Sequence, residues 1–407
     1  MKTLRNIADY VKAKVKVNEI GLQDYVSTDS MLPNKDGISS PLTIPSSGNV
    51  THYQAGDILV SNIRPYFKKI WYATKDGGCS NDVLVFRVID GDETDSQYLY
   101  YLLSQDSFFD HMMAGANGAK MPRGNKKLIP DFVVPDFDLP YQRKIASLLA
   151  SYDELIEVNR KQIRLLEEAA RRIYEEWFVD FRFPGYEKVS VKDGIPNGWS
   201  KKSIGDVIAY EIGGGWGNDS KDGDFTNPAY VIRGTDFHSV TDGTIKEVPL
   251  RYHTDSNLRS RTLQDGDIIF EVSGGSKTEG AARTVYITDT LLEQLDAPAI
   301  CASFCKLVRS KDRKFAKYLF DTFQYLRRKD ETRKYDKYSA GNIVNYRWAD
   351  FLAQQKIIIP KEDIVERYSA IVENMYHQVQ NLARQISEAQ VGRNLLLPRL
   401  MSGEVKL

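Results

Sequence analysis

Three kinds of catalytic site that act on DNA have recognisable residue patterns, and this sequence completes none of the three. Adenine methyltransferases hold the target amine with an Asn/Asp-Pro-Pro-Tyr/Phe run, whereas Asn227-Pro228-Ala229-Tyr230 lacks the second proline and is interpreted as a turn. A nucleotide-driven motor needs a glycine directly before its phosphate-binding lysine. Ser276 precedes Lys277, which favours a surface loop. The acidic and basic residues of Glu404-Val405-Lys406 are isolated from any nuclease-like cluster. The sequence therefore predicts no catalytic site.

Metal and cofactor sites are not expected either. Cys301 and Cys305 form a lone C-x-x-x-C, Cys79 is distant, and the five histidines are scattered, so the four ligands of a zinc site are not in place. Three cysteines also make no disulfide framework, which fits a reducing compartment. The sequence begins without an apolar signal core and holds no stretch of about 18 apolar residues. We expect a cytoplasmic protein.

DNA binding needs cations that meet phosphates, and forked or amide side chains that reach base edges. Residues 116–127 carry such side chains without any acidic residue, and their glycines would allow a close approach to a groove. The candidate contacts in this segment are Lys120, Arg123, Asn125, Lys126 and Lys127.

A second segment, residues 334–347, lies at the corresponding place later in the chain. A single run of charges is usually a solvated face, but the matched position and the aromatic neighbours favour DNA contact. The candidates here are Lys337, Tyr338, Asn342, Tyr346 and Arg347. Residues 306–317 form a further cluster with six cations and one acid.

Two further segments each allow two interpretations. The glycine-rich segment 211–220 holds Trp216 and Asn218, and it is either a loop that enters a groove or a tight turn around a packed tryptophan. Arg64, Lys68 and Lys69 stand beside a predicted strand, where they serve as phosphate contacts or as framework.

An internal repeat organises the chain. The 407 residues exceed a usual single domain, and 42% hydrophobic with 27% charged residues indicates a folded protein. TLRNIADY (3–10) resembles SIGDVIAY (203–210), GDILV (56–60) resembles GDIIF (266–270), and FVVP (132–135) resembles IIIP (357–360). Strands are predicted at 57–63, 82–89, 267–272 and 283–288, and short helices at 98–107 and 315–325. Each half is thus a mixed region followed by a long helix.

The two long helices carry apolar residues at alternating spacings of three and four, which is typical of a coiled coil. The first series runs from Ile145 to Ile173 and the second from Ile364 to Ala389, with the polar members Asn159, Gln162, Gln378 and Gln385. Two such series at equivalent places favour pairing of the helices with each other. The predicted pairing residues are Leu148, Tyr152, Leu155, Leu166, Ile371, Met375 and Leu382.

Several segments resemble the specificity subunits of type I restriction-modification systems. The resembling residues are YVSTDSMLPNK (25–35), GDILVSNIRPYFKK (56–69), the run from Pro140 to Glu187, and LLLPRLMSGEV (395–405). The central run is the most specific. As in that family, a strand that ends in proline is followed by a helix that starts with Gln-Arg and ends with Trp-Phe-Val-Asp-Phe. The second mixed region lacks the IRPYFKK segment, which indicates that the two halves recognise different DNA sequences.

The resemblance implies an α+β fold in which two similar target-recognition domains are joined by two long antiparallel coiled-coil helices, with pseudo-twofold symmetry. It also implies a non-catalytic subunit that binds double-stranded DNA, two methyltransferase subunits and the restriction subunits. S-adenosylmethionine, ATP and Mg²⁺ would then be bound by those partners, and no cofactor by this chain.

The expected organisation places the first recognition domain at residues 1–140 and the central spacer helix at 141–180. A linker at 181–200 precedes the second recognition domain at 201–360, and the C-terminal spacer helix and tail occupy 361–407. Two alternatives of other classes remain at this point. One is a self-sufficient DNA-modifying enzyme with an unrecognised catalytic site, and the other is a coiled-coil scaffold that does not contact DNA.

Overall fold

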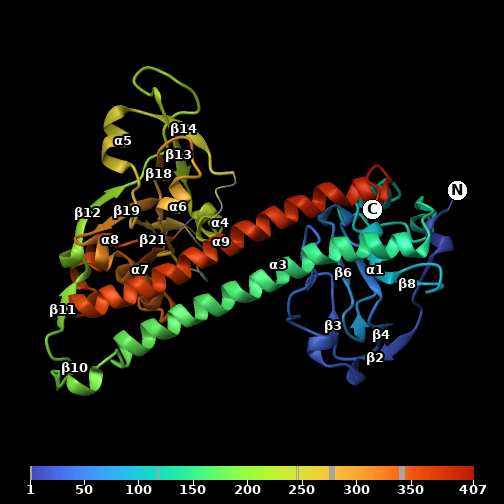
Figure 1. Cartoon of the computed structure of the whole chain (residues 1–407), viewed down its shortest axis with the longest axis horizontal. Coiled ribbons are helices and arrows are strands. Elements are labelled where there is room, and N and C mark those ends of the chain that lie inside the picture. Colours follow the sequence, from blue (N-terminus) through green and yellow to red (C-terminus); the bar gives the residue numbers. More distant parts are fainter. Residues whose placement is uncertain are drawn as a thin grey trace. The chain divides into compact units, whose positions relative to one another are not determined.

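The structure is a computed structural model that describes residues 2–116, 118, 120–243, 245, 247–274, 280–338 and 344–407. The chain forms two compact units (Figure 1). The first unit joins Met1–Ile156 to Glu388–Leu407, and the second is Glu157–Ser387. Each unit therefore contains a mixed region and stretches of both long helices.

An antiparallel sheet forms the centre of the first unit. Its strand order is β1 (Ala8–Tyr10), β8 (Val83–Val88), β5 (Ile58–Ser61) and β6 (Ile70–Tyr72). Helices α1 (Ser96–Leu103) and α2 (Asp106–Ala114) pack their apolar faces against this sheet, and Leu397 and Leu400 complete the same core. The end of the chain is thus a structural part of the first unit.

The second unit repeats this sheet in the same order. The strands are β12 (Ile208–Gly213), β19 (Cys305–Ser310), β15 (Ile268–Glu271) and β17 (Thr284–Tyr286), again antiparallel throughout. The four predicted strands are confirmed as β5, β8, β15 and β17, and the two predicted short helices as α1 and α7 (Ala316–Arg328). The sheet order supports the duplication that the sequence predicts.

A buried ion pair occupies the same place in both sheets. Asp57, at the start of β5, accepts hydrogen bonds of 2.7 Å from Nε and from Nη2 of Arg87 on β8. Asp267, at the start of β15, accepts the same two bonds at 2.7 Å from Arg309 on β19. The aspartates are 2% and 0% exposed, so their charges depend on these partners.

A parallel strand pair is also shared, but the strands added to it differ. In the first unit β3 (Tyr25–Val26) runs parallel to β7 (Gly77–Cys79), and β4 (Asn49–Tyr53) and β2 (Lys14–Lys16) extend the sheet beyond β7. In the second unit β13 (Asn227–Ile232) runs parallel to β18 (Ala299–Cys301), and β14 (Leu250–His253) is added on the side of β13 instead. The shared framework is thus extended on opposite sides.

Two predictions about local structure are wrong. The Asn227–Tyr230 run is not a turn, because it forms the first part of β13 and pairs with both β14 and β18. The FVVP segment makes only an isolated bridge, between Val133 and Thr3, whereas its counterpart forms β22 (Lys356–Ile359), which pairs with β11 (Ser200–Ser203). Only the second copy has four consecutive residue pairs there.

Further short elements occur in both units. They include η4 (Pro65–Phe67), β9 (Val191–Lys192), β10 (Ile195–Pro196), α4 (Phe237–Thr241), α5 (Asp255–Arg261), β16 (Ser273–Gly274), α6 (Asp289–Leu292), β20 (Asp336–Tyr338), β21 (Val344–Tyr346) and α8 (Trp348–Gln354).

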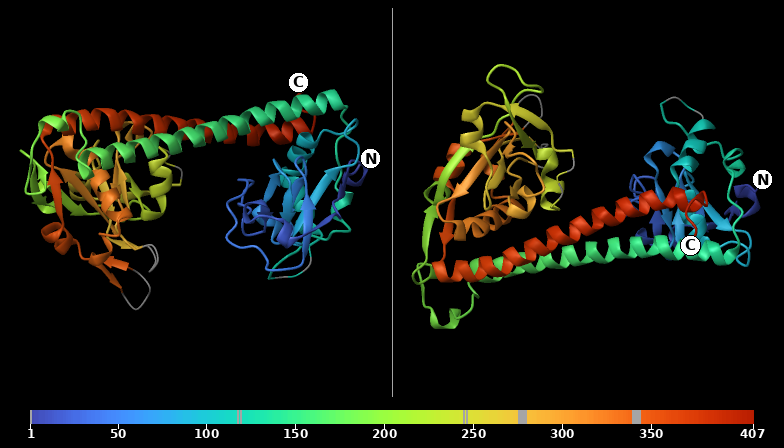
Figure 2. Two further views of the ribbon diagram at one scale, coloured as in Figure 1. Left: turned by 90° about the horizontal axis from the view of Figure 1, so that it is seen from below. Right: turned by 45° about the horizontal axis from the view of Figure 1, so that its top comes forward.

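Two long helices follow the mixed regions, as predicted. Helix α3 spans Leu139–Tyr174 and continues as one π turn to Val179, and α9 spans Glu362–Met401. They lie side by side and antiparallel within each unit (Figure 2). Tyr141 donates to the Val405 carbonyl and Arg393 pairs with Asp153 in the first unit. Asn159 donates to Gln385 in the second.

The buried seam of each helix differs from the predicted one at every second contact. Leu155 and Ile371 were expected to pair but are 43% and 40% exposed, whereas their neighbours Ile156 and Val372 are 4% and 1% exposed. A straight helix has 3.6 residues per turn, so the residue predicted at the seam and the apolar residue after it lie on two adjacent stripes. In both helices the second of these stripes is the buried one. The buried or half-buried seam of α3 is Ile145, Leu149, Tyr152, Ile156, Asn159, Ile163, Leu166 and Ala170.

Candidate nucleic-acid interface

The 120–127 segment of the first unit is an ordered loop attached to the end of β5. Arg123 forms a β-bridge with Ile63, the Arg64 amide donates to the Pro122 carbonyl at 2.8 Å, and the Gly124 amide donates to the Asn62 carbonyl at 3.2 Å. A Cβ on Gly124 would lie 2.9 Å from Oδ1 of Asn62, so the close approach requires glycine. The loop is therefore fixed on the central sheet.

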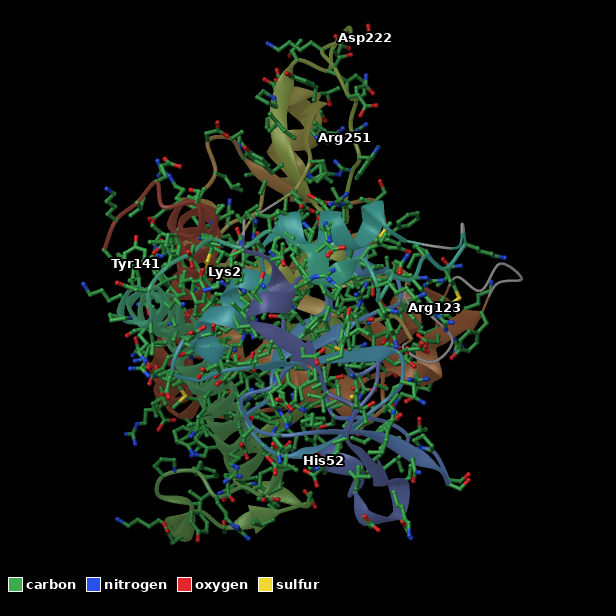
Figure 3. The ribbon with its side chains drawn as sticks, turned by 90° about the vertical axis from the view of Figure 1, so that its right-hand side faces the viewer. Lys2, His52, Arg123, Tyr141, Asp222 and Arg251 are labelled. Atoms are coloured by element: carbon green, nitrogen blue, oxygen red, sulfur yellow. The ribbon has the colours of Figure 1, made fainter. Side chains whose placement is uncertain are left out.

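The cations of this loop face solvent. Lys120, Arg123, Lys126 and Lys127 are exposed, and Arg123 is labelled in Figure 3. Nη2 of Arg123 lies 3.3 Å from Asp82, but the Arg123 side chain remains 56% exposed. Asn125 uses Oδ1 to accept a 3.0 Å bond from the Lys127 amide, so this side chain also stabilises the turn. The arrangement offers four flexible cations on a rigid base.

The second unit places a β-hairpin at the equivalent position. Strand β21 forms a bridge from Asn345 to Ser273, and the Tyr346 amide donates to the Val272 carbonyl at 2.8 Å. These contacts correspond to those of Arg123 and Gly124 in the first unit, so Asn345 occupies the place of Arg123. Lys337 on β20 lies opposite Asn345, and both side chains are exposed.

The structure corrects one residue of this cluster and adds another. Tyr346 was expected to contact DNA, but its ring packs against Phe270 and Phe351 in the core and is 8% exposed. Burial raises the pKa of its hydroxyl. Side chains alternate along β21, so the outward residue is Asn345, which the sequence interpretation missed. The alternation of Val344, Asn345 and Tyr346 was the signal that could have identified it.

The other predicted residues of this cluster lie at the edge of the hairpin. Tyr338 is 49% exposed at the end of β20. The Arg347 guanidinium donates to the Lys334 carbonyl and lies 3.4 Å from Asp350, while its side chain stays 49% exposed. Asn342 lies outside the described residues.

Trp216 belongs to a glycine-rich segment that is firmly anchored. The Arg251 guanidinium lies 4.4 Å from the Trp216 ring centroid, and Nε of Arg251 donates to the Trp216 carbonyl at 2.8 Å. Asn218 exchanges two backbone hydrogen bonds with Tyr252. Gly217 has φ of 69°, and a Cβ there would lie 2.5 Å from the Tyr252 carbonyl oxygen. One face of the Trp216 ring thus lies against the Arg251 guanidinium, while 42% of the residue remains exposed.

His253 lies behind this segment and is fully buried. Neither ring nitrogen has a hydrogen-bond partner among the described residues. Burial lowers the pKa of His253, and the nearby Arg251 and Arg261 lower it further. The imidazole is therefore held in its neutral form.

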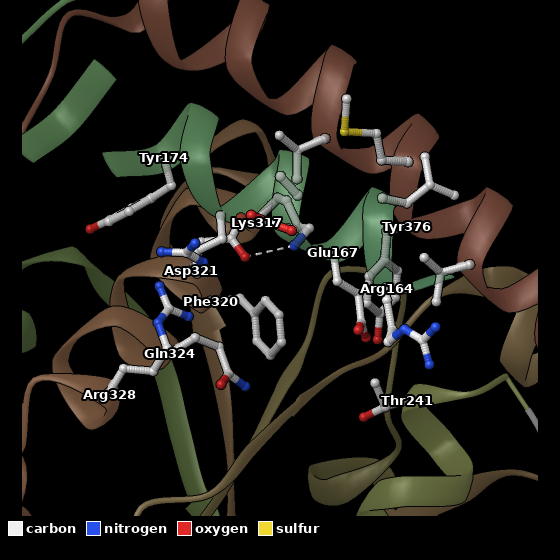
Figure 4. A pocket seen from close by; sticks show the side chains of 17 residues that line it. Arg164, Glu167, Tyr174, Thr241, Lys317, Phe320, Asp321, Gln324, Arg328 and Tyr376 are labelled. Atoms are coloured by element: carbon white, nitrogen blue, oxygen red, sulfur yellow. Dashed lines mark hydrogen bonds and ion pairs between the residues drawn. The ribbon is translucent and has the colours of Figure 1, made fainter. Parts of the chain in front are cut away.

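A cavity of about 430 Å³ lies in the second unit, where α3, α7 and α9 meet (Figure 4). The predicted pairing residues Leu166 and Met375 line it. Lys317 is buried there, and its ammonium lies 2.8 Å from Asp321 and 4.6 Å from the Phe320 ring centroid. The buried charge is thus neutralised by a carboxylate and covered by aromatic rings.

Besides the exposed Leu155 and Ile371, the predicted pairing residues Leu148, Tyr152 and Leu382 are half-buried. Leu148 packs against the core of the first unit, and the Tyr152 ring faces Gly392, where an added Cβ would lie 3.2 Å from it. Leu382 is half-buried in the second unit.

In the ranges that the structure describes, no group of three or more His, Cys, Asp or Glu is arranged to hold a metal ion. The three cysteines are buried free thiols, and burial raises the pKa of Cys79 and of Cys301 to about 12. None of the helices in the described ranges is long and apolar enough to cross a membrane.

Comparison with known proteins gives a consistent result. Residues 8–168 match the family of the type I restriction modification DNA specificity domain. The chain is 25% identical over 330 residues to the type I restriction enzyme MjaIX specificity subunit of Methanocaldococcus jannaschii, covering 79% of this chain and 71% of that one. It is 28% identical over 145 residues to the EcoDI specificity subunit of Escherichia coli, covering 33% and 32% of the two chains.

The fold agrees with these sequence relationships. The crystal structure of a type I restriction-modification S subunit from M. genitalium has a TM-score of 0.61 at 12% identity, covering 98% of this chain and 95% of that chain. The two chains therefore share a fold along nearly their whole length. Together with the match of residues 8–168 and the curated relatives, this similarity supports a type I DNA-specificity subunit.

Proposed function

We propose that this subunit recognises a bipartite DNA target through two recognition domains, residues 1–140 and 201–360. The helices at 141–180 and 361–407 set the distance between the two half-sites, and 181–200 is the linker. The supporting observation is the shared sheet with its buried Asp–Arg pair, which carries different added strands and different outward residues in the two units. Two copies of one framework with different surfaces suit two different half-sites.

The proposed contacts follow the two equivalent loops. In the first unit Arg123 is exposed beside Lys120, Lys126 and Lys127, which suits a base contact surrounded by phosphate contacts. In the second unit Asn345 and Lys337 lie opposite each other on an outward face. An arginine fork suits guanine and an amide suits adenine, so the two positions would select different bases. Asn125, Trp216, Asn218, Tyr338, Asn342 and Arg347 complete the proposed surface.

The proposed partners are double-stranded DNA, two methyltransferase subunits and the restriction subunits, in the cytoplasm. S-adenosylmethionine, ATP and Mg²⁺ would be bound by those partner subunits. The alternative of a self-sufficient enzyme is not favoured, because the curated relatives are named specificity subunits of restriction enzymes.

The test is a footprint of the chain assembled with its methyltransferase partner on DNA that carries the target. The proposal expects two protected blocks separated by an unspecified spacer. Base changes within either block should abolish specific binding, and base changes in the spacer should not. One continuous protected block, or methyl transfer by the isolated chain, would contradict the proposal.

A further inference from the structure

A short turn in the first unit carries two exposed aromatic rings. The turn, η4 with its flanking residues Arg64 and Lys68, connects β5 to β6. Tyr66 and Phe67 are 48% and 38% exposed, and their ring centroids lie 4.7 Å apart. We call this pair with its supporting residues 64–68 the aromatic turn.

The backbone of the aromatic turn is strained and rigid. Arg64 and Lys68 have φ of 50° and 51°, in the left-handed region that non-glycine residues adopt at a cost. The loop packed against the turn has the same property, since Asn34 and Lys35 have φ of 57° and 64°. Four of the nine such non-glycine residues in the described part of the chain therefore lie together. Strain of this kind is concentrated at functional sites.

Hydrogen bonds and ion pairs fix the rings in their exposed position. The Asn34 and Lys35 amides donate to the Phe67 and Lys68 carbonyls at 2.8 and 2.9 Å. The ammonium groups of Lys35 and Lys68 both pair with Asp106, at 2.7 and 2.9 Å. These lysines are neutralised within the protein, so the aromatic faces are the distinctive feature that the turn offers to a partner.

The aromatic turn adjoins the loop that is proposed to contact DNA. The Arg64 amide bonds to the Pro122 carbonyl, next to Arg123, and Met121 beside them is 48% exposed. Nε of Arg64 and Oδ1 of Asn62 are buried without a hydrogen-bond partner among the described residues. In the second unit the places of Asn62 and Arg64 are taken by Val272 and Gly274, so this group of features is specific to the first unit.

We propose that the aromatic turn is a wedge that inserts between adjacent base pairs of the first DNA half-site. This inference rests on the proposed function. Proteins that deform DNA insert apolar side chains at a base step and unstack it, and aromatic rings stack on any base. A rigid turn is needed because a flexible one would fold its rings onto the protein rather than hold the duplex open. The wedge would place Arg123 at the groove beside the deformed step.

The test uses the chain assembled with its methyltransferase subunits and duplexes that carry 2-aminopurine at successive steps of the first half-site. The wild-type complex should raise the fluorescence at one step, because unstacking relieves quenching. Tyr66→Ala/Phe67→Ala should lose that signal and bind the target about 5- to 150-fold more weakly, the range expected for losing one stacked base. Affinity for unrelated DNA should stay the same.

Two further variants keep the test decisive. Tyr186→Ala removes a linker aromatic that is 42% exposed, and it should change neither the fluorescence rise nor the affinity for the target. Phe67→Trp keeps a stacking ring and should retain the fluorescence rise, so it tests the wedge even if the alanine variant fails to fold. Wild-type fluorescence without a rise, or a double variant that behaves like the wild type, overturns the wedge. A folded double variant that no longer assembles with the methyltransferase subunits would overturn the wedge and show that the turn contacts protein instead. Absence of any sequence preference in the wild-type complex would instead refute the proposed function.

Discussion

Asn159 on α3 donates a 3.0 Å hydrogen bond to Oε1 of Gln385 on α9, inside the second unit. Asn159 is 3% exposed, whereas the Gln385 side chain lies at the outer edge of the seam. A polar pair at a helix seam costs stability but fixes the register of the two helices. The bond therefore defines which residues of α3 and α9 face each other.

The asymmetric burial predicts unequal effects of the two substitutions. Gln385→Leu leaves the buried Asn159 amide unpaired and should lower the free energy of unfolding by about 1–3 kcal/mol. Asn159→Leu leaves only the hydratable Gln385 without a partner and should be neutral or stabilising. Urea unfolding followed by circular dichroism measures both, and equal losses in the two variants would show that the bond is not an asymmetric seam contact.

The two buried ion pairs should stabilise different units. Asp57→Ala leaves Arg87 without its carboxylate and should destabilise the first unit by roughly 2–4 kcal/mol, below the full effect of a buried pair because Arg87 is 40% exposed. Asp267→Ala should do the same to the second unit. Hydrogen exchange should show faster exchange in β5 and β8 for the first variant, and in β15 and β19 for the second. Uniform acceleration through both sheets would contradict separate frameworks.

Acid should destabilise the second unit through His253. The folded-state pKa lies below the ordinary value of 6.5, so the unfolded chain binds the proton first as pH falls. Stability from the neutral imidazole is complete above the unfolded-state pKa and is lost as pH decreases from about 6.5 toward the folded-state pKa. His253→Leu should make the melting temperature less dependent on pH in this range. An unchanged slope in the variant would assign the acid sensitivity to other groups.

Arg123 and Asn345 should determine sequence preference at one base pair each. Replacing either by alanine should cost about 1–3 kcal/mol of binding to the target and relax preference at that position. Lys126→Ala and Lys127→Ala should weaken binding to all sequences and reduce the dependence on salt. Tyr346→Phe is the matched control, because the buried hydroxyl should leave DNA binding unchanged. A larger loss of specificity in that control than in Asn345→Ala would reverse the assignment of the outward residue.

The length of the helices should set the spacer between the half-sites. Removing one heptad from α3 and the facing heptad from α9 shortens the pair by about 10 Å at 1.5 Å per residue. The preferred spacer should shorten by about three base pairs, or binding should be lost where the helical phase of DNA no longer fits. Selection of binding sites from a library with randomised spacers measures this, and an unchanged spacer would show that the helices do not set the distance.

The sequence predicted the elements that local patterns determine. The strands β5 and β15 and the long helix α3 follow from periodicity, and the repeat follows from matching segments around Gly56 and Gly266. The register in which the two helices pair could not be predicted from the pattern. Leu155 and Ile156 are both apolar, and only packing determines which of them is buried. The burial of Tyr346, by contrast, was accessible from the alternation of side chains along residues 344–346, which the sequence interpretation did not use.

Three-dimensional pairing was needed to find the equivalent positions in the two units. Arg123 and Asn345 share no residue type, and their common place emerges from their bridges to Ile63 and Ser273. The strained backbone of the aromatic turn likewise has no composition signal, since neither Arg64 nor Lys68 is a residue that favours positive φ.

We propose that one chain recognises two DNA half-sites for a methyltransferase. Mapping of methylated adenines across the genome, in cells with and without the gene, tests it most directly. We expect the gene to add methylation at a single motif of two short blocks separated by a fixed unspecified spacer, and Asn345→Ala to relax the preference in only one block. Methylation at a continuous motif, or a methylation pattern that does not depend on the gene, would contradict it.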